Sequence, residues 1–223
     1  MGILSKEKMA NNPATPAGML AELAKDENLT VREAVARNQN APAQVLSMLA
    51  EDESYSVRCI VAKNPCTPAE ILKKLASDIN PTVRGWAAYN GNTPTEALAE
   101  LAKDEDEIVR EGVAYNKNTS AETLAVLAKD DDILARENVA VNKNTSAETL
   151  AELAKDEFFQ IREAVAQNPN ISPETLSALI EDKSYFVRRA AKSQNDLLNP
   201  KINSGSENVS PRKETEDPVK IKM

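Results

Sequence analysis

The chain has 223 residues and a net charge of −8; hydrophobic residues make up 41% of it and aromatic residues only 4%. This composition suits a helical core of small aliphatic side chains and offers few of the β-branched and aromatic runs typical of strands. The acidic charge argues against tight binding to nucleic-acid phosphates, and no apolar stretch reaches the roughly 18 residues of a transmembrane helix.

The start of the chain, from Met1 to Lys6, has no apolar core of the length of a signal peptide, so we expect a cytoplasmic protein. Histidine is absent, and Cys59 and Cys66 are the only cysteines. Because structural zinc needs four ligands, we expect no metal or cofactor site. Two reduced thiols are the favoured interpretation, and a disulfide between them stays the alternative.

Five columns of identical residues recur every 26 positions, seven times, without one insertion or deletion. The columns run from Asn12 to Asn168, from Leu20 to Leu176, from Leu23 to Leu179, from Asp26 to Asp182 and from Arg32 to Arg188. Such regularity indicates that each copy is a structural unit stacked on the next.

The first copy predicts two short helices. Thr15 and Pro16 favour a helix start, with threonine as the cap and proline in the first turn, and this helix is expected from about Pro16 to Lys25. Later copies offer Ser120 and its equivalents as caps. A second helix is expected from about Leu29 to Arg37, with part of it a candidate for 3₁₀ geometry. The pattern therefore predicts an all-α solenoid of paired short helices.

The seventh copy departs from the pattern, with Lys192 where the others have alanine and Gln194 where they have asparagine. Beyond it the composition turns to Ser, Glu, Lys and Pro without periodicity. We therefore expect an N-terminal lead-in over residues 1–11, a solenoid over residues 12–198 and a disordered polar tail over residues 199–223.

These columns resemble the leucine-rich repeat variant (LRV) family, whose repeats share the segments Asn-Pro-x-Thr-Pro, Leu-x-x-Leu-Ala and Asp-x₄-Val-Arg-x-x-Val-Ala-x-Asn. The resemblance covers residues 12 to about 193, or about four fifths of the chain. It implies a right-handed superhelix of paired short helices, similar in shape to HEAT repeats. The family's founding type has an iron–sulfur cluster in a cysteine-rich N-terminal segment. No cysteine lies in the eleven residues before the first repeat here, so we do not expect the cluster.

The charged and asparagine columns are predicted to be structural. An aspartate six residues before each arginine suggests a charge ladder along the stack, whereas a catalytic site needs an asymmetric pocket. Asparagine at a helix end is expected to adopt the left-handed conformation and to bind the loop backbone through its amide.

Positions that vary between copies are better candidates for a binding surface. On the second helices of the central copies these positions form one exposed stripe, expected to place Tyr89 and Tyr115 side by side, with Gly85 and Gly112 leaving room. The candidate protein-binding residues are Ile60, Lys63, Trp86, Tyr89, Ile108, Tyr115, Leu134 and Val141. Tryptophan and tyrosine anchor many interfaces, although Trp86 filling a gap between helices is a second interpretation.

Two further sets of positions are alternatives. One is a column expected in the loop before the second helix: Tyr55, Pro81, Glu107, Ile133, Phe159 and Tyr185. The other is an acidic column that would contact a basic partner: Glu33, Glu111, Glu137 and Glu163.

The predicted function is a non-catalytic scaffold that binds an unidentified protein or peptide through the second helices. The sequence lacks the usual features of an enzyme: it has no histidine, no phosphate-binding glycine loop and no nucleophile beside a base. The alternative is a HEAT-like DNA-binding or DNA-repair enzyme, which the 31 acidic against 22 basic side chains of residues 1–199 disfavour. The polar last copy argues against end-to-end assembly, so we expect a monomer that binds neither nucleic acid nor membranes.

Overall fold

A computed structural model describes residues 2–199, which form fifteen α-helices and no strand. The first helices of the repeats are α2 (Ala17–Leu23), α4 (Ala43–Leu49), α6 (Ala69–Leu75), α8 (Thr95–Leu101), α10 (Ala121–Leu127), α12 (Ala147–Leu153) and α14 (Pro173–Ile180). The remaining helices are α1 (Ile3–Asn11), α3 (Leu29–Arg37), α5 (Tyr55–Lys63), α7 (Pro81–Tyr89), α9 (Glu107–Tyr115), α11 (Ile133–Val141), α13 (Phe159–Gln167) and α15 (Tyr185–Leu198). Beyond Asn199, the predicted tail lies outside the described residues.

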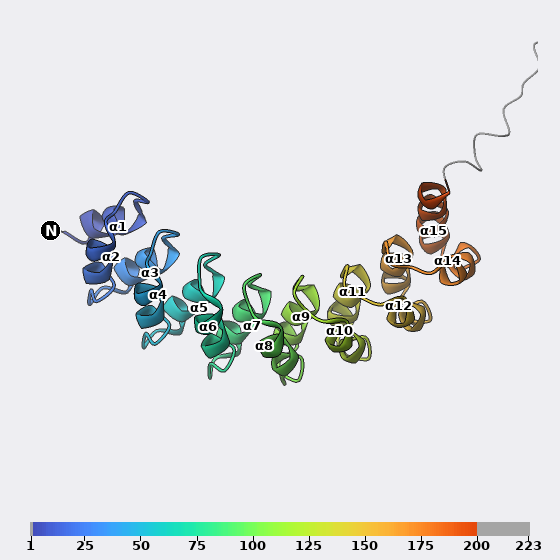
Figure 1. Ribbon diagram of the computed structural model, residues 1–223, viewed down its shortest axis with the longest axis horizontal. Coiled ribbons are helices and arrows are strands. Elements are labelled where there is room, and N and C mark those ends of the chain that lie inside the picture. Colours follow the sequence, from blue (N-terminus) through green and yellow to red (C-terminus); the bar gives the residue numbers. More distant parts are fainter. Residues whose placement is uncertain (1, 200–223) are drawn as a thin grey trace, which may run out of the picture.

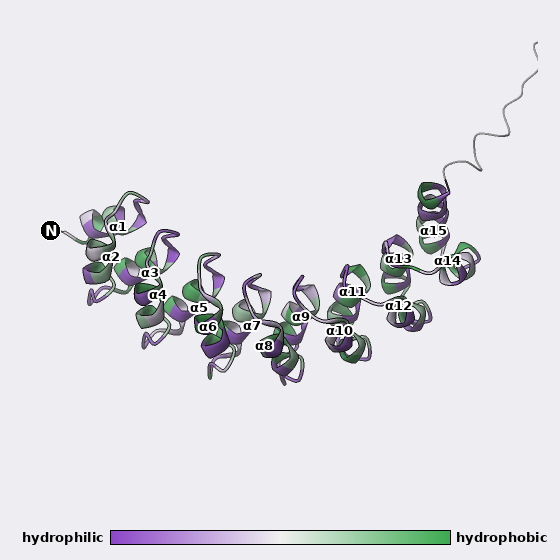
Figure 2. Ribbon diagram, viewed as in Figure 1, coloured by the Kyte–Doolittle hydropathy of each residue, from purple (hydrophilic) through white to green (hydrophobic). Residues whose placement is uncertain are grey.

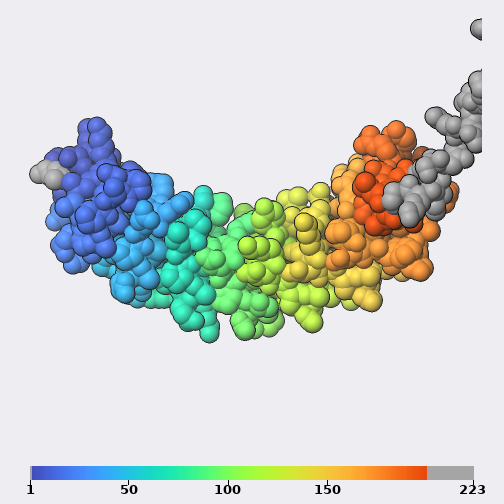
Figure 3. Space-filling model, turned by 45° about the horizontal axis from the view of Figure 1, so that its top comes forward, coloured from blue at the N-terminus to red at the C-terminus, as the bar shows by residue number. Residues whose placement is uncertain are grey.

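The helices form a curved two-layer solenoid (Figure 1). The odd-numbered helices lie along the inner, concave side of the arc, and the even-numbered helices lie along its outer side. Successive odd-numbered helices pack directly against each other, as α7 does against α9. The space-filling view shows one continuous curved body without a break between repeats (Figure 3). The inner face is therefore a surface to which every repeat contributes.

The first helices begin one residue later than expected, because proline precedes the helix instead of opening it. Pro16 has an extended conformation before α2. The prediction that Thr15 caps this helix is wrong: its hydroxyl donates to the carbonyl oxygen of Met9 at 2.6 Å. Where serine replaces proline the predicted cap is confirmed, since Ser120 accepts a hydrogen bond from the backbone of Thr123. The helix also ends at Leu23, earlier than predicted.

The second helices follow the prediction closely, and α3 spans the expected residues. All nine of its residues are α-helical, so the 3₁₀ alternative is wrong. Asn28 caps the helix by accepting a hydrogen bond from the backbone of Thr30. The helix buries Val31 and Val35 completely, as its hydrophobic spacing requires.

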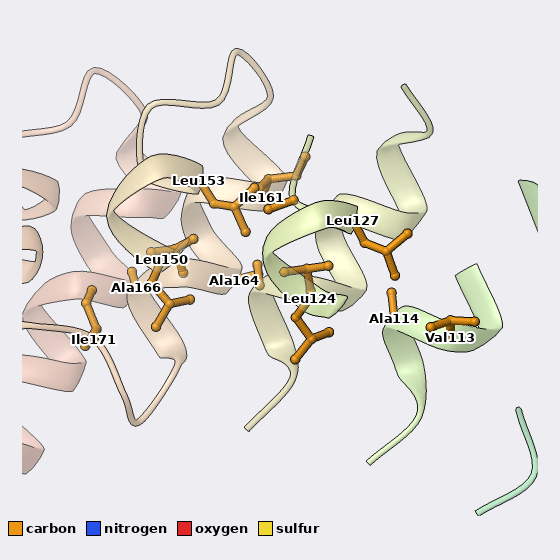
Figure 4. Packing of buried hydrophobic residues seen from close by; sticks show 14 of the residues in the cluster. Val113, Ala114, Leu124, Leu127, Leu150, Leu153, Ile161, Ala164, Ala166 and Ile171 are labelled. Atoms are coloured by element: carbon orange, nitrogen blue, oxygen red, sulfur yellow. The ribbon is translucent and has the colours of Figure 1, made fainter. Parts of the chain in front are cut away.

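The hydrophobic core lies between the two layers and runs from repeat to repeat. Hydrophobic residues occur in both layers, while the connecting loops are mostly hydrophilic (Figure 2). Figure 4 shows Leu124, Leu150 and Ile161, from α10, α12 and α13, within the same packed cluster. A single helix pair has too little apolar surface for a core of its own, so each repeat is stabilised by its neighbours.

The charge ladder is confirmed, and it joins successive repeats. The Nε and Nη2 atoms of Arg84 donate to the two carboxylate oxygens of Asp104 in the next repeat, at 2.6 and 2.8 Å. Its Nη1 donates at 2.9 Å to the carbonyl oxygen of Asp78 in its own repeat. Burial disfavours ionisation of Asp104, but the hydrogen bonds from Arg84 and from the backbone of Asp106, together with the charges of Arg84 and Arg110, outweigh it and hold the pKa of this carboxyl below its usual value. The equivalent pairs link all seven repeats.

The asparagine column also ties the repeats together. Asn116 donates from Nδ2 to the carbonyl oxygens of Ala88 and Asn90 in the preceding repeat, at 2.6 and 2.8 Å. Its Oδ1 accepts from the backbone of Asn118 at 2.9 Å. The predicted left-handed conformation is wrong: Asn116 is extended, and no described residue has a positive φ. The predicted bond from the amide to the loop backbone is confirmed.

The lead-in predicted for residues 1–11 contains a helix that packs like a second helix. Lys6 lies 26 residues before Arg32 and takes the arginine role, with its Nζ 2.5 Å from Asp26. Ala10 is buried, and its carbonyl oxygen accepts from Asn38 as Ala88 does from Asn116. Helix α1 is therefore half a repeat, and it covers the inner layer at the N-terminal end.

Candidate protein-binding surface

Three aromatic rings form a row across the inner face of α7 and α9, which we call the aromatic stripe: Trp86, Tyr89 and Tyr115. The ring centroids of Trp86 and Tyr89 are 5.9 Å apart, and those of Tyr89 and Tyr115 are 5.4 Å apart. The tilted planes are typical of favourable aromatic pairs. Trp86 is 36% exposed and Tyr115 is 62% exposed. The prediction that the two tyrosines lie side by side is confirmed.

Glycine at two positions explains how the rings fit. A Cβ added to Gly112 would lie 2.9 Å from the Tyr89 ring and 3.0 Å from the Cβ of Ala88, closer than side chains pack. Tyr89 therefore lies flat on α9 only because position 112 has no side chain. A Cβ added to Gly85 would meet Ile108 at an ordinary 3.7 Å, so a side chain as small as that of alanine would fit at this position.

Charged groups contact two rings of the stripe, Trp86 at one end and Tyr89 in the middle. The Nζ of Lys63 lies 3.8 Å from the centre of the Trp86 ring, a cation–π contact. The Tyr89 hydroxyl donates to Oε1 of Glu111 at 2.7 Å. Burial, and then the bond to Glu111, raise the pKa of Tyr89, so its hydroxyl stays a proton donor to this carboxylate at neutral pH.

A groove of about 490 Å³ lies beside the stripe, between α7 and α9. Gly85, Trp86 and Tyr89 line it from α7, and Ile108 and Glu111 line it from α9. Asp106, the residue that caps α9, closes one end. The groove thus combines two aromatic walls, an aliphatic wall and two carboxylates.

The other predicted residues are distributed along the same inner layer. Ile108, Leu134 and Val141 are more than half exposed and continue the apolar surface toward α11. Lys63 is exposed, beside Trp86. Ile60 is half-buried and packs against the core, so it contributes little free surface.

Comparison with known proteins agrees with this architecture. The sequence pattern of the family described as leucine rich repeat variant matches residues 29–54 and 159–184. A solved structure described as a leucine-rich repeat variant with a novel repetitive protein structural motif is 31% identical. It has a TM-score of 0.61, over 80% of this chain and 71% of that chain.

The chain belongs to the leucine-rich repeat variant family. The YibA protein of Escherichia coli is 18% identical with a TM-score of 0.53, over 87% of this LRV chain and 86% of YibA, and shares the fold. None of the curated proteins matches the chain.

A second aromatic cluster lies on the inner layer of the LRV solenoid, at α13 and α15. Phe159 and Phe186 stack with centroids 5.6 Å apart, and Tyr185 meets Phe186 edge-on at 5.8 Å. Arg189 lies over both α15 rings. Phe186 shares its phase with Ile108 and was missed because only the central copies were compared. Phe159 and Tyr185, expected in loops, are the first residues of their helices.

Residues 2–199 of the LRV chain contain neither a cluster of metal-binding side chains nor a membrane-spanning helix. No group of three or more histidine, cysteine, aspartate or glutamate side chains there is placed to hold a metal ion. No helix in this part of the chain has the length and hydropathy needed to cross a membrane.

Proposed function

We propose that this LRV protein is a non-catalytic scaffold that binds another protein, or a peptide segment of one, on its concave face. The observation that carries the proposal is the aromatic stripe: an exposed tryptophan and tyrosine, pre-positioned beside a groove on the inner layer. Rigid aromatic side chains next to a groove are the residues that contribute most to protein interfaces.

The repeated polar residues support the proposal, because their side chains hold neighbouring repeats together. The ladder arginines bind aspartates of the next repeat, and the column asparagines bind backbone carbonyls of the previous one. Among residues 2–199 no buried side-chain nitrogen or oxygen lacks a hydrogen-bond partner. The variable inner positions are the ones left available for a partner.

The partner we propose is a protein and not a nucleic acid. The groove and its surroundings carry carboxylates, which repel phosphate. Because a solenoid can present its inner face to a partner as a single chain, we propose that the protein acts as a monomer. We propose that it acts in the cytoplasm, as its sequence suggests.

Affinity capture from native lysate tests the proposal. We expect proteins captured by the wild-type chain to be lost by the Trp86→Ala/Tyr115→Ala variant, which removes the two exposed rings and leaves the half-buried Tyr89 in place. The matched control, Met48→Ala/Val126→Ala, removes exposed apolar side chains from the outer layer and should capture normally. If the Trp86→Ala/Tyr115→Ala variant captures the same proteins as the control variant, the concave face is not the binding surface.

A further inference from the structure

We propose that the groove between α7 and α9 binds the side chain of a lysine or arginine, and that the partner contributes it from a basic segment. This inference rests on the proposed function and adds the chemistry of the partner. It follows from three features of the groove: its aromatic wall, its carboxylates and the charge of the surface around it.

The aromatic wall already binds one cation. The ammonium of Lys63, from α5, lies 3.8 Å from the centre of the Trp86 ring. The groove lies between α7 and α9, and Lys63 does not line it. The negative face of an indole ring attracts ammonium and guanidinium groups. A second cation, supplied by a partner, can contact the Trp86 ring from the groove that this ring lines.

The charged groups that line the groove are acidic. Asp106 and Glu111 line it, and no basic side chain does. Glu111 accepts one hydrogen bond, from Tyr89, and a carboxylate has room for more. An apolar side chain in this groove would remove water from two carboxylates without replacing its hydrogen bonds, which is costly. A guanidinium or ammonium group supplies those hydrogen bonds and the opposite charge.

On the α9 and α11 side the surface around the groove has the same sign, and on the α5 side the ammonium of Lys63 is held against Trp86. In residues 105–115 and 131–141 the only basic residues are Arg110 and Arg136, and both are bound to aspartates of the ladder. Seven acidic residues lie in the same two segments: Glu105, Asp106, Glu107, Glu111, Asp131, Asp132 and Glu137. This field attracts a basic segment and repels an acidic one. The aliphatic stem of lysine or arginine matches the apolar lining at Ile108 and Gly85.

The chain provides its own probe for this groove, because Trp86 is the only tryptophan. We would titrate the full chain with a peptide of repeated Gly-Ser-Arg units while recording tryptophan emission. Two peptides of equal length serve as comparisons, one with citrulline and one with glutamate in place of arginine. Citrulline keeps the shape of arginine and removes its charge. The arginine peptide should change the emission and bind at least about tenfold more tightly than the citrulline peptide, and the glutamate peptide should not bind.

Matched variants locate the binding. Glu111→Gln and Asp106→Asn each remove one charge from the groove, and the second keeps a capping oxygen, because asparagine caps α3 and α7 at the same position. Each should weaken the arginine peptide by several-fold and their combination by about tenfold or more. Glu163→Gln makes the same change in the same column of α13, away from the groove, and should have little effect.

Three results would overturn the inference. Equal binding of the arginine and citrulline peptides would make the groove an apolar site, and the scaffold function would still stand. Absence of arginine-peptide binding would reject the basic partner. Binding only after the basic residues Arg212, Lys213, Lys220 and Lys222 are changed to glutamine would assign the groove to the chain's own C-terminal segment. The scaffold function fails separately, if lysate capture does not depend on Trp86 and Tyr115.

Discussion

Substitution of a single column asparagine tests what holds the repeats together. Asn116 is 2% exposed and makes three hydrogen bonds with its side chain, two to the preceding repeat and one to its own loop. Asn116→Ala removes all three. It leaves the carbonyl oxygen of Ala88 and the backbone amide of Asn118 without these bonds, while the carbonyl oxygen of Asn90 keeps its bond from the backbone amide of Thr93.

The expected cost follows from these bonds. Each contributes about 0.5–1.5 kcal/mol, so the loss of all three should cost about 3 kcal/mol, the middle of the summed range. For a chain of this length, about 1 kcal/mol lowers Tm by roughly 2–4 °C, so Asn116→Ala should lower it by about 6–12 °C. Asn116→Asp keeps the shape and places a buried carboxylate against two carbonyl oxygens. It should cost at least as much near neutral pH.

Urea and thermal denaturation followed by helical circular dichroism measure both effects. The control is Asn118→Ala, the same substitution two residues away. Asn118 is exposed, and its side chain makes one bond, to the carbonyl oxygen of Gly91 at 2.7 Å, so its loss should cost less than about 1 kcal/mol. If Asn116→Ala is no more destabilising than Asn118→Ala, the asparagine column does not tie the repeats together and the reasoning is wrong.

Three further predictions concern packing, the ladder and pH. Gly112→Ala places a Cβ against the Tyr89 ring and should lower the free energy of unfolding by about 1–3 kcal/mol, whereas Gly85→Ala should raise it by about 0.5–1 kcal/mol in the same urea assay. Arg84→Lys replaces the two-pronged contact with Asp104 by a point charge and should cost about 1–2 kcal/mol in urea; an unchanged midpoint would contradict the ladder's role. Since the folded pKa of Asp78, Asp104 and Asp130 lies below the unfolded value of about 3.9, the stabilisation from these three carboxylates is complete above about pH 5 and is lost as the pH falls through the folded pKa. A urea midpoint constant from pH 7 to pH ~3 would refute this.

The repeat architecture was predictable because the sequence is strictly periodic. The bounds of α3 matched, since its hydrophobic spacing and flanking polar residues are set within one copy. The ladder pairing was only half predictable. Asp26 and Asp52 occupy the same phase, and the choice of Asp52 as the partner of Arg32 depends on the offset between stacked repeats, which no single copy contains.

Local backbone and side-chain size explain the remaining differences. The asparagines were expected in the left-handed conformation, but the chain continues extended and the amide reaches the neighbouring repeat. Ala34 and Trp86 share one phase, yet Ala34 is 1% exposed because it fits between neighbouring helices and an indole does not. Periodicity alone cannot show this. The role of Lys6 was predictable, because it lies 26 residues before Arg32, one period upstream of the first arginine of the column.

The candidate surface was predicted in outline. The phase of Tyr89 and Tyr115 placed them on one face, because equal positions in adjacent repeats become neighbours. The bond from Tyr89 to Glu111 and the groove beside Trp86 depend on side-chain rotamers and on the approach of α7 to α9. Those features come from packing between copies, and the sequence of a single copy does not predict them.

Site-specific photocrosslinking tests the central claim, that the inner layer binds the partner, most directly. Tyr115 on α9 and Val126 on α10 are both 62% exposed, one in the inner layer and one in the outer. Each is replaced in turn by p-benzoylphenylalanine in the full chain, and the protein is irradiated in native lysate. A cross-linked protein obtained from position 115 and not from position 126 is the predicted result. Cross-links from position 126 alone, or equally from both positions, would contradict the account.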